Sequence, residues 1–190
     1  MDTYQALDAA ISSTGTIIEG VTPAHLDRPT PCTAWDVRAL SNHVVGTLWA
    51  AHALLTDTPP PYSMGPGSLP DTDLVGDDPV AAYMEAADAA RTAASVPGAL
   101  EGSRPSPLGE MPAAMVMGFA TLDVVVHGWD LARATDQSAS FDEDMVAHCR
   151  GFAQQAITDQ TRGPLIAAPV SVPDSAPAMD RLVGHMGRQP

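Results

Sequence analysis

Apolar residues recur at every third or fourth position along most of this chain, and this period is the strongest constraint on its fold. Over residues 3–21 the period predicts a helix with one apolar stripe. The same period continues over residues 34–56, 77–96, 112–135 and 142–161. A stripe of this kind is stable only when it is buried against another element, so the pattern predicts an all-α bundle. Abundant alanine and few aromatic residues favour the same class.

Capping residues and prolines predict where the helices begin. Thr33 is followed three residues later by Asp36, which resembles a capping box, so the second helix is expected to begin near Ala34. One of the two aspartates before Pro79 is the expected cap of the third helix, with the proline in its first turn. These signals place the helix starts independently of the apolar period.

The connections between the expected helices are long. Residues 57–77 contain five prolines and three glycines, which exclude regular structure for most of the segment and make it a candidate cover for a site. A turn with a short hairpin is expected over residues 97–112, and a short extra helix over residues 178–186. Since no repeat or composition shift divides the chain, residues 1–190 are expected to form a single domain.

The charge and the cysteine content limit which classes of partner and which cellular compartment are expected. The net charge is −14, so we expect neither nucleic acid nor an anionic membrane as a partner. All nine basic residues are arginine, which together with the abundant Ala, Gly and Pro is typical of a GC-rich bacterial genome. Cys32 and Cys149 have no metal or redox spacing and are interpreted as reduced structural thiols. The N-terminus resembles no secretory signal, and the longest apolar run, over residues 113–126, contains Asp123. We therefore expect a cytoplasmic bacterial protein.

The segment TLDVVVHGWDLARAT places polar groups in an otherwise apolar helix. At 100° per residue, His127 lies about 40° to one side of Asp123, and Asp130 about 20° to the other. A carboxylate and an imidazole at positions i and i+4 can bind one metal ion, as two histidines do in H-E-x-x-H. The same arc has an ordinary interpretation as a solvated face, with Asp130 paired to Arg133. Because the upstream part of this helix carries no charged residue, the polar arc is interpreted as placed rather than incidental, and the metal site and the solvated face both stay open.

A catalytic metal needs a third protein ligand and an open coordination position. The best candidate is His43, which lies at the edge of the inward stripe of the second helix. His52 lies about 180° from His43 around the same helix, so the two do not share a site. The remaining histidines have no partner at ligand spacing: His25, His148 and His185.

Four segments, in this order, resemble the metal-binding proteins of the DinB-like superfamily. The closest group is the one related to the N-terminal domain of mycothiol-dependent maleylpyruvate isomerase. The segments are RPTPCTAWDVRALSNHVVG, LVGDDPVAAY, LDVVVHGWDLARAT and APAMDRLVGHMGRQP, and they extend over nearly the whole chain. The resemblance implies an up-down-down-up four-helix bundle with long loops, and the short helix near the C-terminus would be an addition to it.

The resemblance also implies a divalent metal, expected to be zinc, bound by His43, Asp123 and His127. In the isomerase the acidic ligand is glutamate, so Asp123 is one methylene shorter and can shift the ion or change its identity. Asp130 and Arg133 are candidates for orienting His127, with a plain surface pair as the alternative. The isomerase has a further C-terminal domain beyond the matching segments, so its specific reaction is not carried over.

Three functions stay open at this point. The leading hypothesis is a transferase or isomerase in which the metal activates a low-molecular-weight thiol, mycothiol, toward a small electrophile. The second is a metal-dependent hydrolase of a small molecule, and the third is a non-catalytic metal- or ligand-binding module, considered as a homodimer. Trp35 and Trp129 are interpreted as packing anchors. No residue is assigned a catalytic role beyond the metal ligands.

Overall fold

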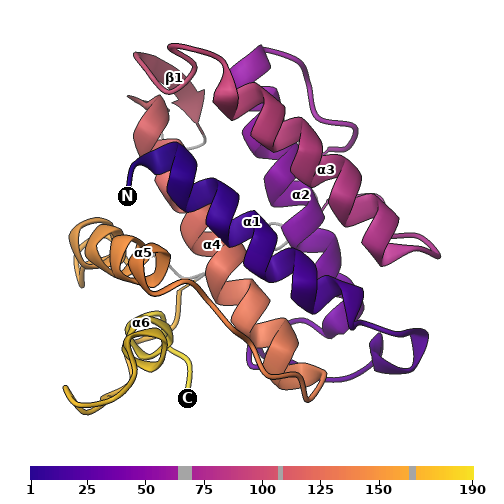
Figure 1. Ribbon diagram of the computed structural model, residues 1–190, viewed down its shortest axis with the longest axis vertical. Coiled ribbons are helices and arrows are strands. Elements are labelled where there is room, and N and C mark those ends of the chain that lie inside the picture. Colours follow the sequence, from indigo (N-terminus) through magenta and orange to yellow (C-terminus); the bar gives the residue numbers. More distant parts are fainter. Residues whose placement is uncertain (64–69, 107–108, 163–165) are drawn as a thin grey trace.

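Four long helices pack side by side in the computed structural model of the chain (Figure 1), which describes residues 1–63, 70–106, 109–162 and 166–190. The four are α1 (Thr3–Glu19), α2 (Val37–Thr56), α3 (Pro79–Ser95) and α4 (Ala113–Ala134). Helices α1 and α4 run in one direction, and α2 and α3 run in the other. Both α1 and α2 contact α3 and α4. The predicted all-α bundle with up-down-down-up order is therefore confirmed.

Smaller elements extend the bundle. They are the 3-10 helix η1 (Pro23–His25), the hairpin strands β1 (Ser103–Ser106) and β2 (Gly109–Pro112), and the helices α5 (Glu143–Ala156) and α6 (Ala178–His185). The antiparallel hairpin joins α3 to α4 and confirms the turn expected there. Helices α5 and α6 contact each other, and α5 also contacts α1 and α4. The extra C-terminal helix is thus present.

The prediction that α2 begins near Ala34 was wrong. The side chain of Asp36 accepts a hydrogen bond of 2.8 Å from the backbone N–H of Ala39. Asp36 is therefore the N-cap itself rather than the third residue after a cap at Thr33, and the helix begins at Val37.

Helix α5 is shorter than predicted, since it ends at Ala156 and not near position 161. The hydroxyl of Thr161 donates a hydrogen bond of 2.6 Å to the Ala156 carbonyl and accepts one of 2.8 Å from the Thr158 backbone N–H. The Ala156 carbonyl and the Thr158 N–H thus form hydrogen bonds with the Thr161 side chain in place of the backbone bonds of a further helical turn.

The connection between α2 and α3 runs back along α2. The hydroxyl of Tyr62 donates to the Gly46 carbonyl at 2.8 Å, and one helical turn closer to the start of α2 the amide of Asn42 donates to the Thr72 carbonyl at 3.0 Å. This return path allows α3 to start at the same end of the bundle as α2. The expected cover over a site falls partly on residues 64–69, which lie outside the described residues.

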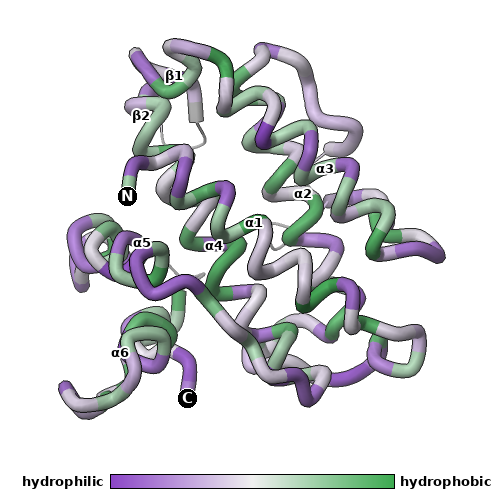
Figure 2. The backbone as a smooth tube through the Cα atoms, viewed as in Figure 1, coloured by the Kyte–Doolittle hydropathy of each residue, from purple (hydrophilic) through white to green (hydrophobic). Residues whose placement is uncertain are grey.

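Helix α4 lies at the centre of the core. Figure 2 shows hydrophobic residues recurring along the bundle helices, with hydrophilic residues between them. By length and composition α4 could cross a membrane, and 67% of its most apolar window is buried inside the bundle. Gly128 allows α1 to approach closely, because a Cβ there would collide with the side chain of Thr14. The strong apolar signal of α4 therefore reflects a core helix.

Candidate metal centre

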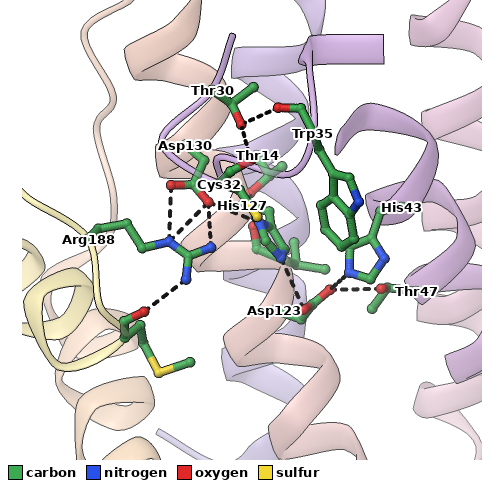
Figure 3. A network of polar contacts seen from close by, with 12 residues as sticks. Thr14, Thr30, Cys32, Trp35, His43, Thr47, Asp123, His127, Asp130 and Arg188 are labelled. Carbon is green, nitrogen blue, oxygen red and sulfur yellow. Dashed lines mark hydrogen bonds and ion pairs between the residues drawn. The ribbon is translucent and has the colours of Figure 1, made fainter. Parts of the chain in front are cut away.

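His43 of α2 faces Asp123 and His127 of α4 (Figure 3). The Nε2 atom of His43 lies 2.9 Å from Oδ2 of Asp123, and Nε2 of His127 lies 3.4 Å from Oδ1 of the same carboxylate. One ligand atom from each of the three residues lies within 4.8 Å of the others. The structure thus brings together the three residues that the sequence and the resemblance single out.

This donor set fits a divalent metal ion. Two imidazole nitrogens and one carboxylate oxygen are ligand types that zinc accepts, with a fourth position open. Donor atoms about 2 Å from a tetrahedral ion lie roughly 3.3 Å from one another. The two distances between the imidazoles and Asp123 are close to that value. The three side chains therefore need only small shifts to bind an ion.

Asp130 supports His127 from the other side of the imidazole ring. Its side chain is completely buried, and its Oδ2 atom lies 3.0 Å from Nδ1 of His127. With Nδ1 donating to this carboxylate, Nε2 is left facing Asp123. A metal-binding histidine usually has such a partner on its second nitrogen, which fixes the ring and its tautomer. Of the two predicted orienting residues, Asp130 thus has the required contact.

Arg188, and not Arg133, is the cation paired with Asp130. Its Nη2 atom donates to Oδ2 of Asp130 at 2.8 Å, and its Nε atom lies 3.3 Å from both carboxylate oxygens. The exposed guanidinium of Arg133 lies instead 5.7 Å from the centre of the Trp129 ring. Sequence reasoning missed Arg188, which lies 58 residues beyond Asp130 and carried no spacing signal.

The two carboxylates shift the pKa values of the site. Burial by itself would lower the pKa of His127, but the charge of Asp123 and the hydrogen bonds to Asp123 and Asp130 raise it to about 9. Burial would raise the pKa of Asp123, but His43 and His127 hold it well below its ordinary value. The carboxylates therefore favour a positive charge on His127, and a metal ion can supply that charge in place of a proton.

Neighbouring side chains hold the candidate ligands in place. The hydroxyl of Thr47 donates to Oδ2 of Asp123 at 2.8 Å. The ring of Trp35 lies against both imidazoles, with centroids 4.5 Å from His43 and 5.6 Å from His127. Although the sequence suggested Trp35 only as a packing residue, it contacts the centre directly.

Cys32 also lies closer to the centre than expected. Its sulfur and ligand atoms of His127 and Asp130 lie within 4.8 Å of one another, and its side chain is partly exposed. Burial raises the pKa of the Cys32 thiol, more than the nearby Arg188 lowers it. The loop is shaped by Thr30, whose hydroxyl donates to the Trp35 carbonyl at 2.8 Å. Cys32 is thus a mostly protonated thiol beside the centre.

Two pockets meet at the centre and share His43, Phe119 and Asp123. The first has a volume of about 290 Å³ and lies between α2 and α4, with Tyr62 and Pro70 at its edge. The second, of about 560 Å³, is lined by residues of the loop before α2, by α4 and by the segment after α6. Two of the candidate ligands, His43 and Asp123, therefore border both pockets, and each pocket can hold a separate small molecule.

Three of the other histidines contact backbone groups away from the candidate ligands. The Nδ1 atom of His52 lies 3.2 Å from the Ala89 carbonyl, and His25 accepts from the Thr22 backbone N–H. His185 contacts backbone carbonyls at the end of α5. The candidate ligand set with two histidines contains His43 and His127 and none of these three.

Comparison with known proteins relates this chain to a family. The family described as the mycothiol maleylpyruvate isomerase N-terminal domain matches residues 7–132, a range that includes the three candidate ligands and Asp130 but not Arg188. Two uncharacterized proteins of Mycobacterium tuberculosis, MT0763 of strain CDC 1551 and Rv0738 of strain H37Rv, are each 31% identical over 99% of this chain and 98% of their own length. No solved structure matches the chain. The chain therefore belongs to the mycothiol maleylpyruvate isomerase N-terminal domain family, a DinB-like family.

Proposed function

We propose that this protein is a metal-dependent thiol transferase or isomerase that uses mycothiol, or a closely related thiol, on a small electrophile. The observation that carries the proposal is the convergence of His43, Asp123 and His127 at the junction of two pockets. The family relationship supports mycothiol as the thiol. In this proposal the ion is zinc, the compartment is the cytoplasm, and residues 1–190 act as a single domain.

A divalent ion bound here would supply a Lewis acid that lowers the pKa of a thiol, as zinc does for water. The residues of the chain would orient the ligand side chains and supply the negative charge that binds the ion. Asp130 holds His127 so that Nε2 faces the ion, and Thr47 restrains the Asp123 carboxylate. The ring of Trp35 covers both imidazoles and excludes water from that side.

The second pocket suits the thiol because it is the larger and the more polar of the two. Its lining includes the side chains of Thr33 and Arg188 beside His127. A sugar-linked thiol such as mycothiol needs hydrogen-bonding groups along its length, and the first pocket offers few of them. This difference supports the second pocket as the site of the thiol, and the first is then left for the electrophile.

Metal analysis of the purified protein tests the ligand assignment. We expect close to one divalent ion per chain in the wild type and almost none in the His43→Ala and Asp123→Ala variants. The matched control is His52→Ala, on the same helix, which should retain the metal. If both ligand variants keep their metal, the assignment is wrong.

Incubation with mycothiol and monochlorobimane, with and without a chelator, tests the reaction class. Metal-dependent formation of the conjugate supports the proposal. Turnover of an ester or amide without thiol would favour the hydrolase. Absence of any turnover in the metal-loaded protein would favour a binding module. The oligomeric state of the protein would then be measured next.

A further inference from the structure

The first pocket is lined almost entirely by apolar side chains. The apolar lining includes Ala50 and Leu54 of α2, and Val116, Phe119 and Ala120 of α4. The pocket ends at His43 and Asp123, so a molecule inside it lies directly beside the candidate metal ligands. A cavity of about 150 Å³ is enough for benzene. The first pocket, at about 290 Å³, has room for one substituted ring or a short branched chain.

The two hydroxyl groups in the described lining of this pocket already have partners. The Tyr62 hydroxyl donates to the Gly46 carbonyl and the Thr47 hydroxyl to Asp123, each at 2.8 Å. Neither hydroxyl proton is therefore available to a ligand without breaking an existing bond. A buried carboxylate needs several donors to offset its desolvation, so an anion would be poorly stabilised in this pocket.

No cation of the chain balances an anion there. The sequence has nine basic residues, all of them arginine, and all nine lie in the described part of the chain. None of them lines the first pocket. Arg188 lines the second pocket, where it is paired with Asp130. A ligand carboxylate would instead lie near Asp123, whose like charge disfavours it.

A charge count at the centre leads to the same result. A divalent ion beside the Asp123 carboxylate and one thiolate would have no net charge left for a second anion. In the transfer reaction, the thiolate sulfur forms a bond to an electrophilic carbon, and the leaving group departs with the electron pair of the broken bond. Nothing in this step requires the electrophile to carry a charge.

We infer that the first pocket is a subsite for a neutral, apolar electrophile of about one ring in size, and that it discriminates against carboxylates. The placement of the electrophile rests on the proposed function, whereas the preference of the pocket for neutral ligands follows from its lining alone. Binding can therefore be tested without turnover.

The experiment compares methyl benzoate with benzoate as probes, by calorimetry and by NMR, in chelator-treated protein without thiol and in metal-loaded protein with mycothiol present. We expect methyl benzoate to bind at least tenfold more tightly than benzoate in both forms. Tighter or equal binding of benzoate would overturn the inference. The metal-loaded arm is the severe test, because a carboxylate could bind an ion directly.

Variants that fill the pocket locate the binding. Ala50→Phe and Val116→Phe fill it from α2 and α4, respectively, and each should weaken methyl benzoate at least tenfold. The matched control is Met115→Phe, at the exposed neighbouring position of α4 outside the lining of both pockets, which should leave binding unchanged. If both filling variants fold and bind methyl benzoate normally, the subsite assignment is wrong.

A gain of function completes the test. Leu54→Arg adds a cation to the first pocket and should raise the affinity for benzoate at least tenfold, and an unchanged affinity in the folded variant would contradict the charge argument. Loss of metal-dependent conjugation with intact methyl benzoate binding would refute the proposed function and leave this inference standing. If both filling variants conjugate monochlorobimane as the wild type does, the subsite inference is refuted and the proposed function stands.

Discussion

Two aspartates of α4 contact the same histidine, and their surroundings differ sharply. Asp123 and Asp130 lie on one face of the helix, about two turns apart, and each has an oxygen within 3.4 Å of an imidazole nitrogen of His127. The side chain of Asp123 is 30% exposed and borders both pockets, whereas that of Asp130 has no exposure. Asp130 has a permanent cation in Arg188, whose side chain is only 11% exposed.

The difference shows how one helix can carry two kinds of carboxylate. The charge of Asp130 is balanced within the fold, so this residue can hold His127 but has little capacity for a further cation. The charge of Asp123 is balanced in part by a proton on His127, and this proton can exchange with a metal ion. Each of the following experiments tests this contrast.

The largest effect is expected from removing the buried carboxylate. In metal-free protein at pH 9.5, where His127 has lost most of its charge, Asp130→Ala should lower the free energy of unfolding by about 3–5 kcal/mol, because Arg188 would be left buried without a partner. Asp123→Ala should lower it by only about 1–2 kcal/mol, since it removes partly exposed hydrogen bonds. Urea denaturation of both variants measures the difference. Equal losses would mean that the two sites do not differ in the way described.

The stability of the metal-free protein should fall as the pH rises. The pKa of His127 is raised from an ordinary 6.5 to about 9, so the protonated histidine contributes fully below pH 6.5, and this contribution is lost as the pH approaches 9. At about 1.4 kcal/mol per pKa unit, the loss is about 3 kcal/mol. Denaturation curves between pH 6 and 9.5 measure it, and NMR of the imidazole identifies the group.

The control for this titration is His127→Asn, which should show a much flatter stability profile over the same interval. Metal affinity should change in the opposite sense, because a proton on His127 competes with the ion and is lost as the pH rises. A metal affinity that falls between pH 6.5 and 9 would contradict this competition.

A milder change at Asp130 isolates its role as a support. Asp130→Asn should weaken metal binding about 10–100-fold, because the amide holds the histidine less strongly than the carboxylate does. Competition with a chromophoric chelator measures the affinity. The matched control is Asp136→Asn at the end of α4, where the aspartate forms an exposed pair with Arg28 and the affinity should not change. Equal effects of the two substitutions would show that the result is a general effect of charge.

The smallest effect is expected at Thr47. Thr47→Val keeps the shape and removes the donor to Asp123, so it should lower stability by about 1 kcal/mol and metal affinity by less than tenfold. Thr56→Val is the control on the same helix, because that hydroxyl donates only to the His52 carbonyl within α2. A loss of affinity as large as that of Asp130→Asn would place Thr47 among the main supports.

Local patterns predicted most of the secondary structure. The apolar period located the bundle helices, and the aspartate before Pro79 located the start of α3. The two main errors occurred at helix ends, at the start of α2 and the end of α5. Both ends are decided by a single side chain, Asp36 or Thr161, that bonds to the backbone. Helix ends depend on such individual bonds, whereas the body of a helix is specified by many residues at once.

The sequence by itself determined that Asp123 and His127 lie on one helical face, because the geometry of a single helix fixes residues four positions apart. It also placed His43 near the inward stripe of its own helix, and the family resemblance related it to the other two. As a metal site the three remain a prediction. Their proximity is a property of how α2 packs on α4.

Only the tertiary structure decided which cation balances Asp130 and what surrounds the centre. Helical spacing suggested Arg133, but Asp130 points inward, and the partner is Arg188, which follows a glycine in the left-handed region after α6. The two pockets likewise form where loops and helices far apart in the chain meet. Local backbone geometry constrains residues within a turn or two, whereas contacts across 58 residues depend on how whole elements pack.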